Sequence, residues 1–176
     1  MRKWFAALAV LTSVCVSAQE ITVEDIWRKG TFSSDGVYGL RSMNDGEHYT
    51  TLKYGPEGVM VLQYSYETGE VVDTLVSDAQ IDGASIQSYS FSDDEQQMMI
   101  ATEVEGVYRY STREVNYIFD RATGKSTPLS SEKQMFATFS PNGAKVAFVR
   151  NNNLFVKDLE SDKETQITFD GEWNKV

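Results

Sequence analysis

The residue with the clearest capacity for chemistry is Arg109, which stands between Tyr108 and Tyr110. A guanidinium group is planar and permanently charged, so it can donate paired hydrogen bonds to a carbonyl or carboxylate group. The alternative is a surface arginine that stacks on a neighbouring tyrosine and binds nothing else. The residue types therefore leave two roles open for Arg109, substrate binding or a plain surface position.

Other residue patterns do not predict a catalytic or metal centre. The sequence has no Gly-x-Ser-x-Gly nucleophile elbow, no phosphate-binding glycine loop and no zinc-ligand spacing. Its only histidine, His48, has no nearby nucleophile, and we expect an ordinary strand residue. Residues 93–95 are all acidic, but they lack the alternating spacing and the glycine of a calcium loop, so we expect a solvated turn. We expect no catalytic residue, no metal and no cofactor in this chain.

The first 18 residues are typical of a secretory signal peptide. Arg2 and Lys3 precede a mostly apolar stretch, and residues 16–18 form a small-residue cleavage pattern that predicts a new N-terminus at Gln19. The apolar stretch is shorter than the roughly 20 residues of a membrane span. A lipoprotein signal acylated at Cys15 is the alternative, although the residues before it fit that pattern badly. We therefore expect export to the bacterial periplasm or cell surface.

Length and charge limit the possible classes of protein. A chain of 176 residues is one domain or part of a larger one. The formal net charge is −10, and loss of the two basic residues of the signal makes the chain more acidic. We expect no nucleic acid partner, because binding to nucleic acid needs clustered Lys and Arg. We expect a signal peptide over residues 1–18, a lead-in over 19–36 and a β-domain over 37–176.

One short helix and many strands are expected after the signal. Thr22 can cap a helix over residues 22–29, with Asp25 as its capping-box partner and Gly30 as the left-handed stop. The remainder alternates segments rich in Val, Ile, Tyr, Phe and Thr with turn residues, and no second helix is expected. The expected strands cover residues 37–42, 48–54, 59–66, 71–76, 86–91, 97–103, 114–119, 135–139, 144–150, 153–158 and 164–168.

Turn sequences repeat along the chain. Residues 91–95 match 139–143, residues 117–125 match 155–163, and a fainter copy runs from residue 43 to residue 70. The distance from Ser92 to Ser140 is 48 residues. Four strands in a period of this length are typical of one propeller blade. The fold class is therefore all-β, an incomplete β-propeller of about three four-stranded blades preceded by the signal peptide and the short helix.

The blade count also suggests a longer protein. A closed propeller usually has about four to eight blades, and three blades would leave two open edges. We therefore interpret the chain as a piece of a longer protein. The alternative is a self-sufficient β-domain.

Blade two is longer than blade three between its second and third strands. Ser92 and Asp120 are 28 residues apart, whereas Ser140 and Asp158 are 18 apart. The ten extra residues, 103–112, are expected to form a long loop that carries Arg109. Loops on a rigid scaffold are where binding residues concentrate, so this loop is the candidate binding element.

These segments also resemble a known family. Residues 108–111 and 117–120 resemble the second-blade region of dipeptidyl peptidase IV, and residues 136–149 and 152–157 resemble its next blade. Residues 21–27 resemble the entry segment of bacterial members. The resemblance implies an eight-bladed propeller joined to a C-terminal α/β-hydrolase domain. Such enzymes release N-terminal Xaa-Pro or Xaa-Ala dipeptides by serine-type proteolysis, with a Ser-Asp-His triad.

The resemblance assigns one site residue to this chain. Arg109 matches the family's arginine that contacts the substrate carbonyl and steadies a glutamate pair, while the pair and the triad have no counterpart here. The chain is then an inactive N-terminal fragment of a secreted prolyl dipeptidyl peptidase, whose partners are peptides with penultimate Pro or Ala. The resemblance leaves a homodimer of the full-length protein open. The alternative is a non-catalytic envelope propeller that binds a protein or glycan.

Overall fold

The computed structural model describes residues 20–33, 36 and 39–173, and the chain divides into two units, residues 1–36 and 37–176. The predicted signal peptide lies outside the described residues. In the first unit, α1 (Val23–Trp27) begins with the predicted capping box. The Thr22 hydroxyl accepts the Asp25 N–H at 3.1 Å, and the Asp25 carboxylate accepts the Thr22 N–H at 2.9 Å. The helix is shorter than predicted, and Gly30 beyond it has a φ of 60°.

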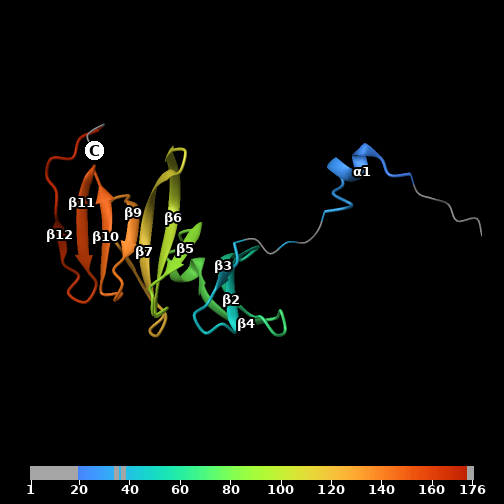
Figure 1. Cartoon of the computed structure of the whole chain (residues 1–176), viewed down its shortest axis with the longest axis horizontal. Helices are drawn as coiled ribbons and strands as arrows, with labels where there is room; N and C mark the ends of the chain where they lie inside the picture. Colours follow the sequence, from blue (N-terminus) through green and yellow to red (C-terminus); the bar gives the residue numbers. More distant parts are fainter. Residues whose placement is uncertain (1–19, 34–35, 37–38, 174–176) are drawn as a thin grey trace, which may run out of the picture. The chain divides into compact units, whose positions relative to one another are not determined.

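Within the described residues, twelve strands form three four-stranded antiparallel sheets (Figure 1). The prediction of about three four-stranded blades is confirmed, with one strand more than the eleven expected. We call the sheets blade one, blade two and blade three. Blade one contains β1 (Arg41–Ser42), β2 (His48–Gly55), β3 (Gly58–Ser65) and β4 (Val71–Ser77). Blade two contains β5 (Ser88–Phe91), β6 (Gln97–Tyr108), β7 (Ser111–Asp120) and β8 (Lys125–Pro128). Blade three contains β9 (Met135–Phe139), β10 (Lys145–Arg150), β11 (Asn153–Asp158) and β12 (Glu164–Gln166).

Three elements differ from the prediction. The fourth strand of blade two, β8, was not expected, because its four residues include a proline and few strand-forming side chains. The β4–β5 connection contains a 3-10 turn, η1 (Asp78–Gln80), where no second helix was expected. Long-range contacts fix this turn: the Asp78 carboxylate accepts the N–H of Val59 at 2.9 Å and that of Ile86 at 2.8 Å. The predicted loop over residues 103–112 is mostly strand.

Two hydrophobic cores lie between neighbouring blades, and blade two contributes to both. Met98 and Ile100 of β6 belong to the core shared with blade one, while Met99 between them belongs to the core shared with blade three. Successive strand residues point to opposite faces, so β6 is buried on both faces over this stretch. Blade two is therefore the most constrained of the three blades, and it forms a rigid base for the outer part of β6 and β7.

The repeated turns of blades two and three share their hydrogen bonds. The Ser92 hydroxyl accepts the Gln97 N–H at 3.0 Å and donates to Asp94 at 2.6 Å. In blade three the Ser140 hydroxyl accepts the Lys145 N–H at 3.0 Å and bonds to Asn142 at 2.8 Å. Side chains of this kind replace backbone partners in turns, which explains why the repeat is visible in the sequence.

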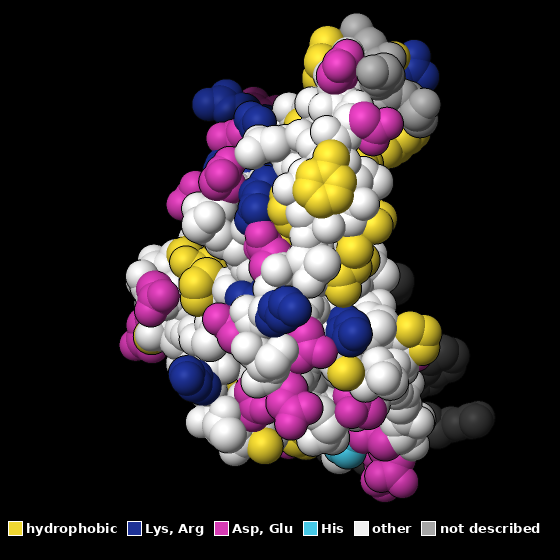
Figure 2. Space-filling view, turned by 90° about the vertical axis from the view of Figure 1, so that its left-hand side faces the viewer, with side chains coloured by type: hydrophobic (Ala, Val, Ile, Leu, Met, Phe, Trp, Pro, Cys, Tyr) yellow, Lys and Arg dark blue, Asp and Glu magenta, His cyan; other side chains and the backbone are white. Residues whose placement is uncertain are grey.

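Blade three presents a partly apolar outer face (Figure 2). Exposed large hydrophobic residues in and after this blade are Phe136, Leu154, Ile167, Phe169 and Trp173. In the described part of the chain, the helix is far too short to cross a lipid bilayer.

Candidate functional site

The segment that carries Arg109 is a long hairpin rather than a loop. Strands β6 and β7 stay paired far beyond the rest of their sheet, and the last pair joins Tyr108 to Ser111. Arg109 and Tyr110 therefore form a two-residue turn at the tip. The strands rise together beyond the neighbouring strands (Figure 1). The sequence spacing located the extra residues correctly, but the prediction that they form a loop was wrong.

Two bulges shape this hairpin, and both add a residue to β6. The pairing shifts between Thr102 and Glu105 and again between Gly106 and Tyr108. A bulge bends its strand and leaves a residue outside the ladder. Glu103, in the first bulge, has a φ of 48°, which is uncommon for a residue other than glycine. The hairpin is thus redirected at its base, a few residues before the tip.

Arg109 is exposed at the tip of the hairpin. Its guanidinium carbon lies 5.7 Å from the centre of the Tyr108 ring, and Tyr110 beside it is 97% exposed. Among the described residues, no hydrogen bond or ion pair involves the guanidinium, so its donors are open to solvent. The backbone φ of Arg109 is 28°, in a region that side-chain-bearing residues avoid. Such strain is often found at functional positions.

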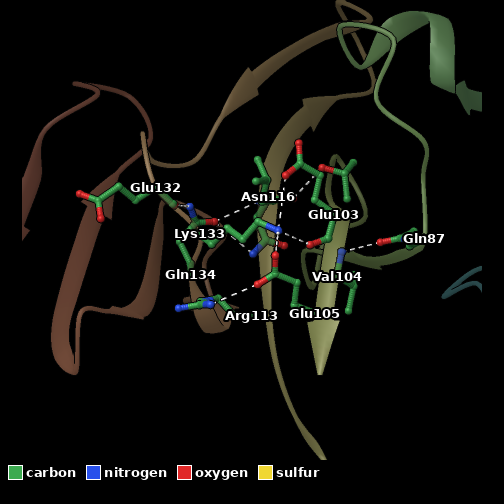
Figure 3. A network of polar contacts seen from close by, with 11 residues as sticks. Gln87, Glu103, Val104, Glu105, Arg113, Asn116, Glu132, Lys133 and Gln134 are labelled. Carbon is green, nitrogen blue, oxygen red and sulfur yellow. Dashed lines mark hydrogen bonds and ion pairs between the residues drawn. The ribbon is translucent and has the colours of Figure 1, made fainter. Parts of the chain in front are cut away.

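The base of the hairpin is held by Lys133, in the connection between β8 and β9 (Figure 3). Its ammonium group donates to the Glu103 carbonyl oxygen at 2.8 Å and to Glu105 Oε1 at 2.7 Å. Glu103 Oε2 lies 3.4 Å away. Arg113 of β7 pairs with the other Glu105 oxygen at 3.1 Å. Three oxygen atoms of β6 therefore surround one ammonium group.

These contacts shift two pKa values in opposite directions. The hydrogen bond from Lys133, followed by that from Arg113, lowers the pKa of Glu105 below its ordinary value. The hydrogen bond to Glu105 is the main cause that raises the pKa of Lys133. Both groups are therefore charged at neutral pH, and the ion pair is fully formed there.

Gln134, next to Lys133, fixes the connection to β7. Its backbone exchanges two hydrogen bonds with Glu114, at 2.8 and 2.9 Å. Its side chain is fully buried, and Oε1 accepts both the backbone N–H and the side-chain amide of Asn116, at 3.0 and 3.2 Å. The Gln134 amide nitrogen donates to the carbonyl oxygen of Glu132. Lys133 is thus presented to the hairpin from a firmly held backbone.

A groove of about 630 Å³ lies between the hairpin and blade three. The hairpin contributes Glu105 and Arg113 to its lining, the connection contributes Lys133, and the β10–β11 turn contributes Asn151. The lining thus combines charges of both signs, and Glu105 already pairs with Arg113 and Lys133.

Sequence reasoning proposed Arg109, whose binding role stays a prediction, and it did not single out Lys133, Glu105 or Gln134. One signal was available: Glu103 and Glu105 are two residues apart, so in a regular strand they would share a face that attracts a cation. The partner could not be identified, because Lys133 lies 28 residues further along the chain from Glu105.

The other candidates are structural. His48 lies in β2, and its Nδ1 is 2.6 Å from Asp45, whose pKa this contact lowers. Asp94 is part of a turn, and the hydrogen bond from the Ser92 hydroxyl is the main cause that lowers its pKa. Neither residue lines the groove beside the hairpin.

The chain is similar to known proteins in its sequence. Residues 92–176 match the dipeptidyl peptidase IV N-terminal region. The chain is 30% identical over 159 residues to prolyl endopeptidase FAP of Homo sapiens, which covers 89% of this chain and 20% of the relative. It is 36% identical over 84 residues to a probable dipeptidyl-aminopeptidase B of Neurospora crassa, which covers 46% of this chain and 9% of the relative.

A solved structure extends the likeness to the fold. The dipeptidyl peptidase 4 of Porphyromonas gingivalis matches with a TM-score of 0.70 and 37% identity, over 89% of this chain and 23% of that chain. The chain spans about a fifth of the length of the first curated relatives it matches. These findings place the chain in the dipeptidyl peptidase IV family, as part of that family's N-terminal propeller region.

Proposed function

We propose that this chain is the N-terminal propeller part of a secreted prolyl dipeptidyl peptidase, in which Arg109 binds the peptide substrate. The observation that carries the proposal is the open guanidinium at a strained hairpin tip, in a chain whose relatives are peptidases. In this role Arg109 donates to a substrate carbonyl oxygen, and the nucleophile lies outside this chain. The substrates are peptides with Pro or Ala as the second residue.

Arg109→Ala in the full-length protein tests the substrate role. Losing a hydrogen bond from a charged donor costs about 1.5–3 kcal/mol, which corresponds to a loss of about tenfold to a hundredfold in kcat/KM. The assay is release of a chromophore from Gly-Pro and Ala-Pro substrates. Lys53→Ala removes a charge from an exposed position in β2 and should leave kcat/KM unchanged. Equal kinetics in Arg109→Ala and wild type would remove the role of Arg109.

The 176-residue chain alone should be inactive toward the same substrates. It contains no Gly-x-Ser-x-Gly sequence, so acyl transfer has no nucleophile of that kind. Turnover by the purified chain would contradict this expectation. If the full-length protein also lacks activity, a propeller that binds a protein or glycan becomes the better proposal.

Export is part of the same proposal. The pattern of residues 1–18 supports a cleaved signal and a periplasmic or surface location in a bacterium. N-terminal sequencing of the protein recovered from the envelope should begin at Gln19. A protein that retains Arg2 and Lys3 would contradict it.

A further inference from the structure

The peptide group between Glu103 and Val104 is held from both sides by side chains outside the β6–β7 ladder. The Lys133 ammonium donates to the carbonyl oxygen of this group at 2.8 Å. The N–H of the same group donates to Gln87 Oε1. Lys133 and Gln87 lie on opposite sides of β6 (Figure 3). We call the two contacts the peptide clamp.

The peptide clamp acts where the hairpin changes direction. The first bulge lies between Thr102 and Glu105, so this peptide group has no regular place in the ladder. Polar backbone groups without partners are costly, and here each is satisfied by one side chain. The orientation of the bulge, and of everything beyond it, therefore depends on Lys133 and Gln87.

Both side chains of the peptide clamp are anchored independently of the hairpin tip. The backbone of Gln87 donates to the Ala101 carbonyl oxygen at 2.9 Å, at the buried end of β6. Lys133 adjoins Gln134, whose backbone is bonded to Glu114. Only 23% of the Lys133 side chain is exposed, so its ammonium group has little freedom.

We propose that Lys133 is a positioning residue, which with Gln87 fixes the pose of the β6–β7 hairpin and so delivers Arg109 to the substrate. The inference rests on the proposed function of Arg109, and it names the residues that orient the Arg109 guanidinium. The contact to Glu105 and its pairing with Arg113 extend the same restraint one residue pair toward the tip.

A double-mutant experiment in the full-length enzyme tests the proposal. Lys133→Met keeps most of the length of the side chain and removes the ammonium donor. We expect KM for Ala-Pro substrates to rise about fivefold to tenfold with little change in kcat, because the site is intact but Arg109 is misplaced. In an Arg109→Ala background the same substitution should have no further effect.

Two control variants separate positioning from general stability. Lys133→Arg keeps a charged donor, so its KM should stay close to the wild-type value. Lys145→Met removes a lysine from β10 of blade three, which pairs with Asp158 at 4.0 Å and not with the hairpin. This variant should leave KM unchanged. If Lys133→Met raised KM by the same factor in the wild-type and Arg109→Ala backgrounds, the proposal would be overturned, since Lys133 would then have a merely structural role.

A second measurement does not depend on catalysis. Trypsin cleaves after arginine, and Arg109 lies at an exposed tip. Cleavage there needs local opening, so Lys133→Met should be cut after Arg109 several-fold faster than wild type or Lys145→Met. Unchanged cleavage overturns the clamp itself. Faster cleavage in a protein without peptidase activity supports the clamp and refutes only the proposed function.

Discussion

Arg109 occupies a turn position that other residues adopt more easily. Two-residue hairpin turns of the favoured types need positive φ at the first central position, where Gly and Asn are preferred. The φ of 28° at Arg109 therefore carries a conformational cost, on the order of 1 kcal/mol. The arginine at this position is therefore not a residue that the turn itself favours.

Arg109→Gly should therefore separate stability from function. Removing the strain should leave the thermal midpoint unchanged or raise it, while kcat/KM falls as it does for Arg109→Ala. Thermal unfolding and the Ala-Pro assay on one preparation provide both values. A lower midpoint in Arg109→Gly would mean that the arginine stabilises the tip.

The Glu105–Lys133 pair sets the pH range of the hairpin's support. Because the pKa of Glu105 is lowered, the stability that its carboxylate gives to the folded hairpin is present above the ordinary carboxyl pKa. This stability is lost as the pH falls through the lowered value. Because the pKa of Lys133 is raised, the stability that its ammonium group gives to the folded hairpin is present below the ordinary lysine pKa. This stability is lost as the pH rises through the raised value. Arg113 and Glu103 are the other charged groups that contact the pair.

KM should therefore rise when acid protonates Glu105. In wild-type enzyme the rise should begin below the ordinary carboxyl range. In Glu105→Gln, KM should already be raised at neutral pH and change less over that interval. Initial rates at a series of acidic pH values check this, and identical profiles for the two enzymes would show that Glu105 has no such role.

At the scale of elements, the connection between β8 and β9 supports the hairpin through a buried amide. Gln134→Leu would leave the backbone N–H and side-chain amide of Asn116 without their acceptor. An unsatisfied buried donor costs about 1–3 kcal/mol, so the thermal midpoint should fall clearly. Gln96→Leu is the matched control, since Gln96 is exposed in a turn and should have little effect.

The sequence predicted most strands because each repeats a local pattern. The capping box at Thr22 and the paired turns at Ser92 and Ser140 depend on residues close together in the chain. The strand β8 was missed because its pairing with β7, rather than its composition, holds it in the sheet. The hairpin was predicted as a loop for two reasons. Two bulges interrupt the regular alternation along β6, and the bonds from Lys133 come from 28 and 30 residues further along the chain.

For the whole molecule, the outer faces of blades one and three differ from the two buried interfaces. Cores form only between blades one and two and between blades two and three in the described chain. Exposed apolar residues on the outer blades include Tyr54, Tyr66, Val71, Val72, Leu154 and Ile167. Exposed apolar surface of this kind favours association.

The isolated chain over residues 19–176 should therefore self-associate. Light scattering should give a mass that increases with concentration, and a dye that fluoresces on apolar surfaces should bind. The full-length protein should show neither effect to the same degree. A strictly monomeric chain that binds no dye would indicate that these faces are better shielded than their exposure suggests.

The position of Lys133 links the orientation of the β6–β7 hairpin to the order of synthesis. Blade two is made before the segment that orients its hairpin, because Lys133 follows the last strand of that blade. Domains generally fold from the N-terminus as the chain emerges. If Lys133 orients the hairpin as proposed, the Arg109 guanidinium takes its final direction only after the segment between blades two and three has formed, so the hairpin is fixed later than the blade that carries it.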